Sequence, residues 1–341
     1  MRDFASTLLR WYATNGRTLP WRGTHDPYLI WVSEIILQQT RIEQGRDYYL
    51  RFTHHWPTVQ ALAAATEDEV LLQWQGLGYY SRARNMLHAA RQVMQQGETF
   101  PCTIEGLRQL KGVGPYTAAA IGSMAFGLPV ATVDGNVYRV LARHFGIDTP
   151  INSTQGQKLF AQLAQSLLPQ QQAADFNQAM MDFGAIQCTP QSPHCDTCPL
   201  ADTCVALHTD QTERLPVKEN KTKVTTRRLT YIYIRCNGFT AIHRRPAGDI
   251  WQGLWEPVKM EEGKMKMEEG TMKMEDAVCL RQNVKHVLTH QVLLADFYLL
   301  LTDQRPALPP DYIWVHESEL SGYAVPRLVE ILLESVPEIT E

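Results

Sequence analysis

Two acidic residues stand in contexts that suit the cleavage of a glycosidic bond. Glu34 lies inside the apolar run Trp31–Leu37. Burial there would raise its pKa and keep it protonated near neutral pH, as a general acid requires. Asp134 precedes the helical run 137–146, whose N-terminus favours an ionised carboxylate that could stabilise a sugar cation. Each residue also has a purely structural interpretation, as a surface glutamate for Glu34 and as a helix N-cap for Asp134.

Four of the seven cysteines fall within 17 residues, with the spacing C-x6-C-x2-C-x5-C. They are Cys188, Cys195, Cys198 and Cys204. Disulfides are disfavoured in a chain without a secretory signal. Four thiolates suit either a structural zinc ion or a [4Fe–4S] cluster, and ligand chemistry alone does not separate these two.

A glycine-rich loop, "LKGVGPYTAAA" at residues 110–120, separates two helical runs. Gly112 and Gly114 allow a close backbone approach to a phosphate, and the following helix start adds positive potential. The P-loop pattern and a surrounding βαβ unit are both missing from the sequence, which excludes two common nucleotide sites. An ordinary helix–helix turn remains the alternative.

The elements that must position these groups are mostly helical up to residue 204. Asp26-Pro27 predicts a helix start that continues to about Thr40, and Thr66 predicts another. The apolar run Phe176–Gln187 predicts a helix leading into the cysteines.

The texture changes after Cys204. Residues 208–227 are polar and aperiodic, which predicts a linker. Residues 229–245 alternate as strands do and break at Asn237-Gly238, a hairpin signal. Residues 286–301 indicate further strand, 326–336 indicate a last helix, and the Lys-Met-Glu repeat at 258–276 indicates a loop insertion.

Composition places the 341-residue chain among soluble globular proteins, with 44% hydrophobic and 20% charged residues. No apolar run is long enough to span a bilayer and no secretory signal is present, so we expect a cytoplasmic protein without membrane contact. The net charge of −4 argues against a broadly basic nucleic-acid binder but leaves a local basic groove open.

Seven segments together resemble the MutY family of A/G-specific adenine DNA glycosylases, within the helix-hairpin-helix superfamily of endonuclease III. The resemblance covers most of residues 15–204. Its segments are Arg17–Arg22, Trp31–Thr40, Gly76–Asn85, the glycine loop, Val133–Asn136, Phe176–Gly184 and the cysteine run. Lys111 stands where the family pattern has proline. The cysteine spacing resembles the family's iron–sulfur loop, which implies a [4Fe–4S] cluster rather than zinc.

The resemblance also assigns roles. It implies that Glu34 protonates adenine and that Asp134 faces the sugar, with Tyr116 and Asn136 assisting. Bifunctional members carry a Schiff-base lysine at the position of Tyr116, and a tyrosine cannot form an imine, so base removal without strand cleavage is expected. The implied contacts to DNA and the flipped base are Arg17, Trp21, Arg22, Gln39, Tyr79, Gly112, Gly114 and Gln178.

The C-terminal part resembles the family's Nudix-like domain, which senses 8-oxoguanine opposite the adenine. The segment Trp251–Pro257 fits that fold, and the Nudix hydrolase signature is missing from the sequence, so no nucleotide hydrolysis is expected. The family commonly has Phe-Ser-His in its lesion-sensing loop. This chain has Leu288, Thr289 and His290 there, which keeps a hydroxyl and the histidine but loses an aromatic face.

We therefore expect an α+β protein of two domains. A helical glycosylase domain would occupy 1–207, with its helix-hairpin-helix near 108–120 and its iron–sulfur loop at 188–204. A linker at 208–227 and a Nudix-like domain at 228–341 would follow. The expected partner is duplex DNA with an adenine:8-oxoguanine or adenine:guanine mispair, bound by a monomer. A glycosylase for another mismatch and a non-catalytic iron–sulfur DNA-binding protein are the alternatives.

Overall fold

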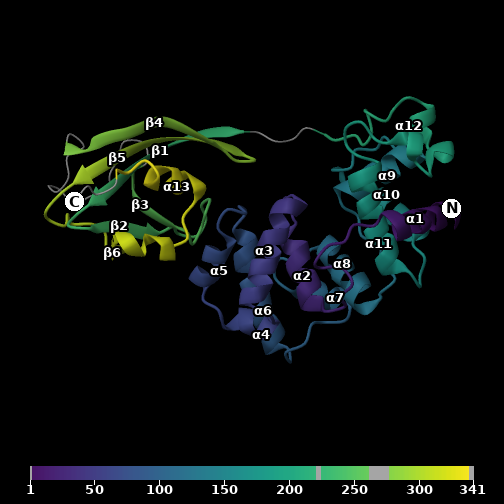
Figure 1. Cartoon of the computed structure of the whole chain (residues 1–341), viewed down its shortest axis with the longest axis horizontal. Coiled ribbons are helices and arrows are strands. Elements are labelled where there is room, and N and C mark those ends of the chain that lie inside the picture. Colours follow the sequence, from purple (N-terminus) through teal and green to yellow (C-terminus); the bar gives the residue numbers. More distant parts are fainter. Residues whose placement is uncertain (1, 220–223, 261–275, 338–341) are drawn as a thin grey trace. The chain divides into compact units, whose positions relative to one another are not determined.

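The amphipathic runs of the first two thirds of the chain fold as helices, and the alternating runs of the last third fold as a sheet (Figure 1). The computed structural model describes residues 2–219, 224–260 and 276–337. Most of the Lys-Met-Glu repeat lies outside the described residues. Two compact units are present, one made of residues 1–64 and 88–220 and the other of residues 65–87 and 221–341. This architecture confirms the expected α+β fold class.

The α-helices and the π-helix of residues 2–208 follow one another with short connections. They are α1 (Arg2–Asn15), α2 (Pro27–Ile36), α3 (Ile42–His55), α4 (Val59–Ala64), α5 (Glu67–Trp74), α6 (Ser81–Gln95), α7 (Ile104–Gln109), α8 (Pro115–Phe126), α9 (Gly135–Phe145), α10 (Thr154–Leu167), α11 (Ala173–Asp182), a π-helix η1 (Phe183–Gln187) and α12 (Val205–His208). Among the described helices, none is long and apolar enough to cross a membrane.

Local sequence signals set several of these boundaries. The Asp26 side chain accepts a hydrogen bond from the Tyr28 amide at the start of α2. Thr66 and Glu69 form a reciprocal capping box at the start of α5. Helix α2 stops at Ile36, earlier than predicted, and Gln39 then adopts a positive φ of 61° that ends helical geometry.

The core of the first unit is formed by α1, α9, α10 and α11, which pack their apolar faces together. Leu8, Leu141, Phe160 and Phe176 lie at its centre and are almost fully buried. Leu215 joins the same core although it lies in the polar segment that we expected to be a linker. The Ile151 amide also donates to the Val217 carbonyl at 3.0 Å. The segment is therefore fixed to the helical unit well beyond residue 207.

The second unit is built on a six-stranded sheet with the order β4-β5-β1-β3-β2-β6. Its strands are β1 (Thr225–Arg235), β2 (Phe239–Arg244), β3 (Trp255–Met260), β4 (Val278–Val287), β5 (Gln291–Leu301) and β6 (Tyr312–His316). β1 and β5 are parallel and the other neighbours are antiparallel. Asn237 and Gly238 both have positive φ in the β1–β2 turn, as predicted for a tight hairpin.

Two apolar clusters cover the two faces of this sheet. Helix α13 (Arg327–Leu333), the predicted last helix, packs Leu328 and Leu332 against Tyr231 and Phe297 on one face. Ile232, Val258 and Leu300 belong to the cluster on the other face. Helix α5 belongs to this unit as well, since Asp68 accepts a hydrogen bond from the Trp255 indole at 3.2 Å.

A buried ion-pair network stands at the centre of the second unit. The Glu256 carboxylate is fully buried and pairs with Arg245, His243 and Lys259, and it accepts a hydrogen bond from the Tyr231 hydroxyl at 2.9 Å. Burial raises the pKa of Glu256, but these partners outweigh burial and lower it from 4.5 to about 2. The network therefore depends on the ionised carboxylate.

The first prediction concerns this network. A depressed folded-state pKa gives stability that is present above pH 4.5 and is lost as the pH falls toward 2. Glu256→Gln should lower the free energy of unfolding at pH 6 by about 3 kcal/mol, because it leaves paired charges without their partner. The difference from wild type should narrow by about 2 kcal/mol at pH 3, as measured by urea denaturation. Glu319→Gln, at an exposed position, is the control. A difference that does not change with pH would contradict the role of the charge.

Candidate functional site

The first unit contains a cavity of about 530 Å3 between the ends of several helices. Nine of the residues that the sequence predicted for catalysis or DNA contact line it. They are Arg17, Trp21, Arg22, Glu34, Gln39, Tyr116, Asp134, Asn136 and Gln178. These residues come from the loop after α1, from α2 and the turn that follows it, from the start of α8, from the first residues of α9 with its cap, and from α11. The structure thus brings together positions that lie up to about 160 residues apart in the sequence.

Glu34 is the most strongly perturbed acid of this cavity. Helix α2 buries it, leaving 8% of the residue exposed. Burial and the neighbouring Asp134 charge raise its pKa, while a hydrogen bond with Tyr116 and the charge of Arg22 lower it, with a net rise to about 7. The surface interpretation of Glu34 is therefore wrong, and the acid carries a proton for much of the time at neutral pH.

Asp134 is both the N-cap of α9 and a wall of the cavity. It accepts hydrogen bonds from the amides of Asn136 at 2.9 Å and Val137 at 2.8 Å, and from the Asn136 side chain at 2.8 Å. Burial raises the pKa of Asp134 above its ordinary value, and these donors act in the opposite direction. Burial therefore works against the helix N-terminus at this position, which corrects the expectation that the anion is simply favoured.

Tyr116 interacts with both carboxyl groups, through a hydrogen bond with Glu34 and through the charge of Asp134. Its hydroxyl lies within hydrogen-bonding reach of Glu34 and contacts the Met181 Sδ at 3.3 Å. Burial and the charges of Glu34 and Asp134 raise its pKa well above the ordinary value, so the phenol stays protonated. Among the described residues that line this cavity, none is a lysine.

Asp182 organises one wall of the cavity, and sequence reasoning missed it. Its carboxylate is fully buried and accepts hydrogen bonds from both Arg17 and Arg22. On the same helix, Gln178 accepts a hydrogen bond from the Tyr12 hydroxyl at 2.8 Å. The segment Phe176–Gly184 had been singled out, but its single acid gave no sign of two arginine partners so far away in sequence.

Two further predicted residues take different environments. Trp21 is buried and packs edge-on against Tyr49, with 5.2 Å between ring centroids. Gln39 is exposed at the rim and holds a positive φ of 61°. Trp21 thus shapes the cavity wall, whereas the Gln39 side chain is free to meet a ligand.

The glycine loop joins α7 to α8, as predicted for a helical hairpin. Gly112 has a φ of 79°, a conformation that favours glycine, and Gly114 is the N-cap of α8. Both glycines are exposed, and a Cβ built on Gly114 would meet no atom within 4 Å. The Lys111 amide donates to the Gln92 side chain at 2.7 Å, which anchors the loop where the family pattern has proline.

The four clustered cysteines line one small cavity together with Arg143 and Gln187. Arg143 donates to the Cys188 Sγ at 3.4 Å and to the carbonyls of Thr189 and Pro190. Arg139 donates to the carbonyls of Cys188 and Gly184 and to the Asn136 side chain at 2.8 Å. Arg139 therefore links the cysteine loop to Asn136, which donates hydrogen bonds to Asp134.

The residues of this cavity fit an iron–sulfur cluster. Burial and the neighbouring thiols raise the pKa of Cys198 to about 11, although the Leu200 amide acts in the opposite direction. Four thiolates lining one small cavity would need positive charge among them, which iron would supply. Arg143 and the backbone amides give the sulfurs the hydrogen bonds that tune such clusters.

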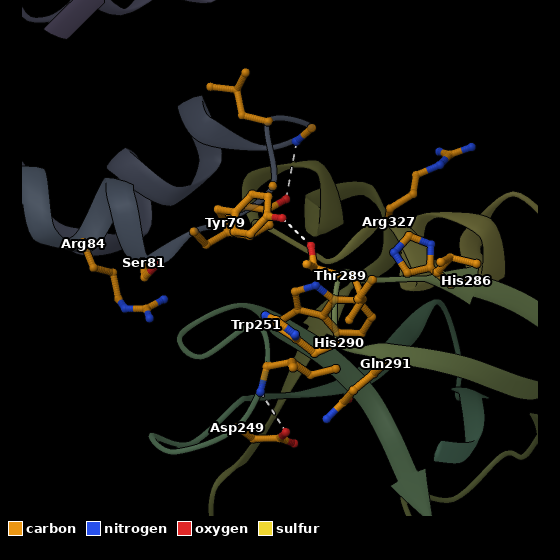
Figure 2. Close-up of a pocket in the computed structure, with 17 residues that line it drawn as sticks. Tyr79, Ser81, Arg84, Asp249, Trp251, His286, Thr289, His290, Gln291 and Arg327 are labelled. Carbon is orange, nitrogen blue, oxygen red and sulfur yellow. Dashed lines mark hydrogen bonds between the residues drawn. The ribbon is translucent and has the colours of Figure 1, made fainter. Parts of the chain in front are cut away.

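The second unit contains its own cavity of about 690 Å3, between residues 76–84 and the turn that joins β4 to β5 (Figure 2). Tyr79, Leu288, Thr289 and His290, all predicted to contact DNA, line it. Figure 2 shows the Tyr79 ring pointing toward Thr289, and the two hydroxyl oxygens lie 2.5 Å apart. The structure thus joins two predicted residues that are 210 positions apart.

Trp251 is an unpredicted aromatic wall of this second cavity. It has a positive φ of 59°, and its ring lies 5.7 Å from that of His286, centroid to centroid. The Arg245 guanidinium lies over the Trp251 ring, 5.6 Å from the ring centroid. Trp251 therefore offers an aromatic surface in the cavity to which Leu288 contributes none.

Comparison with known families finds three matching segments along the chain. Residues 32–169 match the model of the "HhH-GPD superfamily base excision DNA repair protein". Residues 188–204 match the "Iron-sulfur binding domain of endonuclease III", and residues 230–335 match the "NUDIX domain". These matches confirm the helix-hairpin-helix, [4Fe–4S] and Nudix-like predictions.

Individual relatives agree with these matches. The human adenine DNA glycosylase is 44% identical over 222 residues, which cover 62% of this chain and 41% of the human protein. The adenine DNA glycosylase of Buchnera aphidicola subsp. Baizongia pistaciae is 34% identical over 255 residues, covering 74% of this chain and 72% of the relative. A solved thermostable thymine-DNA glycosylase has a TM-score of 0.57 and 33% identity, covering 60% of this chain and 95% of that one. The chain thus spans less than half the length of its human relative.

The second prediction concerns the cysteine cavity. Purified protein should be brown from thiolate-to-iron charge transfer, and Cys198→Ser should lose most of its iron and sulfide because one of four ligands is gone. Metal analysis and the visible absorption spectrum measure this. Cys102→Ser, at an exposed cysteine away from the cavity, should keep both. A colourless wild-type protein that contains zinc would contradict the assignment.

Proposed function

The chain belongs to the adenine DNA glycosylase family, and on this premise we propose that it removes adenine from duplex DNA by hydrolysing the N-glycosidic bond. The proposed substrate is adenine mispaired with 8-oxoguanine or guanine, bound by a monomer. The single observation that carries the proposal is that Glu34 and Asp134 line one cavity of about 530 Å3. A base inside a duplex cannot reach such a cavity, so the adenine must be flipped out of the stack.

The two carboxyl groups divide the chemistry between them. Glu34, with a pKa of about 7, donates its proton to a ring nitrogen of adenine and makes the base a better leaving group. Asp134, held by three hydrogen bonds, faces the sugar and stabilises its developing positive charge. Asn136 and Tyr116 orient the groups around the sugar and the attacking water.

The residues of the cavity favour base removal without strand cleavage. Cleavage of the sugar–phosphate chain by a glycosylase needs an amine that forms an imine with the sugar. Tyr116 occupies the position where an amine would be required, and its phenol stays protonated. The product is therefore an abasic site that breaks on alkali treatment.

Three other parts of the chain hold the DNA. The exposed glycine loop at the start of α8 offers backbone amides to a phosphate. Gln39 and Tyr79, which both have positive φ, enter the duplex beside the mispair. Thr289 and His290 contact the purine opposite the adenine.

The four cysteines have a different role. They hold a structural [4Fe–4S] cluster that fixes the loop 188–204.

Thymine excision is the second candidate function, because the solved thymine-DNA glycosylase is 33% identical to this chain. That protein matches 60% of the chain. The Nudix-like unit of this chain favours the adenine glycosylases, since the Buchnera relatives extend the match to 74% of the chain. Duplexes with an adenine:8-oxoguanine pair and a thymine:guanine pair, assayed side by side, separate the two functions.

The third prediction tests the acid. Glu34→Gln should slow adenine excision by at least about a hundredfold, because an amide cannot donate the proton. Single-turnover cleavage of an adenine:8-oxoguanine duplex, developed with and without alkali, measures this. The affinity for the same duplex should change by less than about threefold, because the substitution replaces a neutral acid by a neutral amide.

Glu43→Gln in α3, an exposed first-turn acid, is the matched control and should excise adenine like wild type. Substantial turnover by Glu34→Gln would refute the acid role. Strand breaks without alkali would refute the monofunctional mechanism.

The fourth prediction tests the second cavity. Thr289→Val and Tyr79→Phe each remove one hydroxyl of the same hydrogen bond. Each should lower the preference for 8-oxoguanine over guanine opposite adenine by about fivefold, the worth of about 1 kcal/mol. Because the two variants remove one shared interaction, the double variant should lose little more than either single variant. Additive losses would show that the two hydroxyls act separately.

A further inference from the structure

The cavity of about 530 Å3 that contains Glu34 and Asp134 is called the adenine cavity below. Asp182 lies beside it without lining it, and its carboxylate is bound by Arg17 and Arg22. One oxygen accepts hydrogen bonds from the Arg17 Nε at 2.8 Å and from Nη2 groups of Arg17 and Arg22 at 2.5 and 2.6 Å. The other accepts from the Arg17 amide at 2.9 Å and the Arg22 Nη1 at 2.5 Å. Five donors thus converge on one buried carboxylate.

The two arginines line the cavity, and Asp182 binds their guanidinium groups. Arg17 and Arg22 both line the cavity, with 26% and 13% of their side chains exposed. Burial raises the pKa of Asp182, but the hydrogen bonds from Arg22 and Arg17 outweigh burial and keep it below the ordinary value. The carboxylate is therefore ionised and neutralises one of the two positive charges.

The same helix also carries the predicted base-contacting amide. Gln178 lies one turn before Asp182 on α11, so the two side chains share a face of the helix. Tyr12 donates to Gln178 at 2.8 Å, and Arg22 lies 5.6 Å from the centroid of the Tyr12 ring. Asp182, Arg22, Tyr12 and Gln178 therefore form one connected wall.

We propose that Asp182 is a positioning residue of the adenine cavity, which orients Arg17 and Arg22 toward the base and neutralises their charge beside Glu34. The proposal rests on the proposed function and adds to it a residue that touches no substrate. The groups that act on Glu34 are Tyr116 from α8, Asp134 from the α9 cap and Arg22 from the loop after α1. Among these, Arg22 is the cation, and Asp182 is its bound counter-charge.

The sign of the effect follows from the charges. Arg22 favours the ionised form of Glu34, and Asp182 opposes Arg22. Asp182→Asn keeps the shape of the side chain but removes its charge, so Glu34 should lose its proton at lower pH. Arg22→Gln removes the cation instead, so Glu34 should keep its proton to higher pH. A purely structural role for Asp182 predicts no such opposite signs.

The test measures excision across pH together with the titration of Glu34. In Asp182→Asn, the alkaline limb of the excision profile should move down by about one pH unit, and the rate at pH 7 should fall about fivefold. Duplex binding should be retained. The titration is followed by carboxyl carbon NMR of the DNA-free, cluster-containing protein labelled at glutamate, with Glu34→Gln assigning the signal.

The two variants and a control keep the outcomes separate. Asp175→Asn, an exposed acid on the same helix, should leave both the profile and the titration unchanged. If Asp182→Asn does not fold, the upward shift expected in Arg22→Gln still tests the charge path. A uniform loss of rate at every pH with an unmoved Glu34 titration would overturn the proposal. If wild type excises no adenine, the proposed function fails, whereas the titration of Glu34 still decides this inference.

Discussion

The helical unit is organised around the cost of taking one carboxyl group out of water. An isolated buried anion is expensive, so Glu34 meets that cost by holding a proton at neutral pH. Burial alone does not set the pKa of Glu34, because neighbouring groups also act on it. Tyr116, Asp134 and Arg22 reach Glu34 from three different segments, and each changes its affinity for the proton. The packing of α2, α8 and α9 is therefore also what sets the chemistry of the cavity.

Charges are also balanced among residues other than Glu34. Four arginines lie at the cavity or the cysteine loop, namely Arg17, Arg22, Arg139 and Arg143, and each donates hydrogen bonds to acceptors of the protein. Arg17 and Arg22 share Asp182, while Arg143 is bound by carbonyls of the cysteine loop and by the Leu215 carbonyl. The second unit repeats the pattern with Arg245 between Glu256 and Asp249. Buried arginines with fixed partners thus give both units rigid polar interiors.

Local patterns in the sequence predicted the parts of the structure that depend on local physics. An acid in an apolar run located Glu34, the Asp-Pro and Thr-Glu signals located two helix starts, and Asn237-Gly238 located a hairpin. Contacts between distant segments were beyond such patterns. Asp182 meets Arg17 across 165 positions, and Leu215 is one apolar residue in a polar run that nonetheless enters the core. The burial of Asp134 was missed for the same reason, because the sequence shows a cap and not what packs around it.

Arg139 joins two regions that have separate chemistry. One guanidinium binds the carbonyls of Gly184 and Cys188 and the side chain of Asn136, and Asn136 in turn holds Asp134. The π-helix Phe183–Gln187 contains Gly184 and ends directly before Cys188, so Arg139 binds the chain where it passes from this helix into the cysteine loop. The backbone of the cysteine loop and the carboxylate of Asp134 are consequently held through one shared guanidinium, so a substitution of Arg139 would disturb both at once.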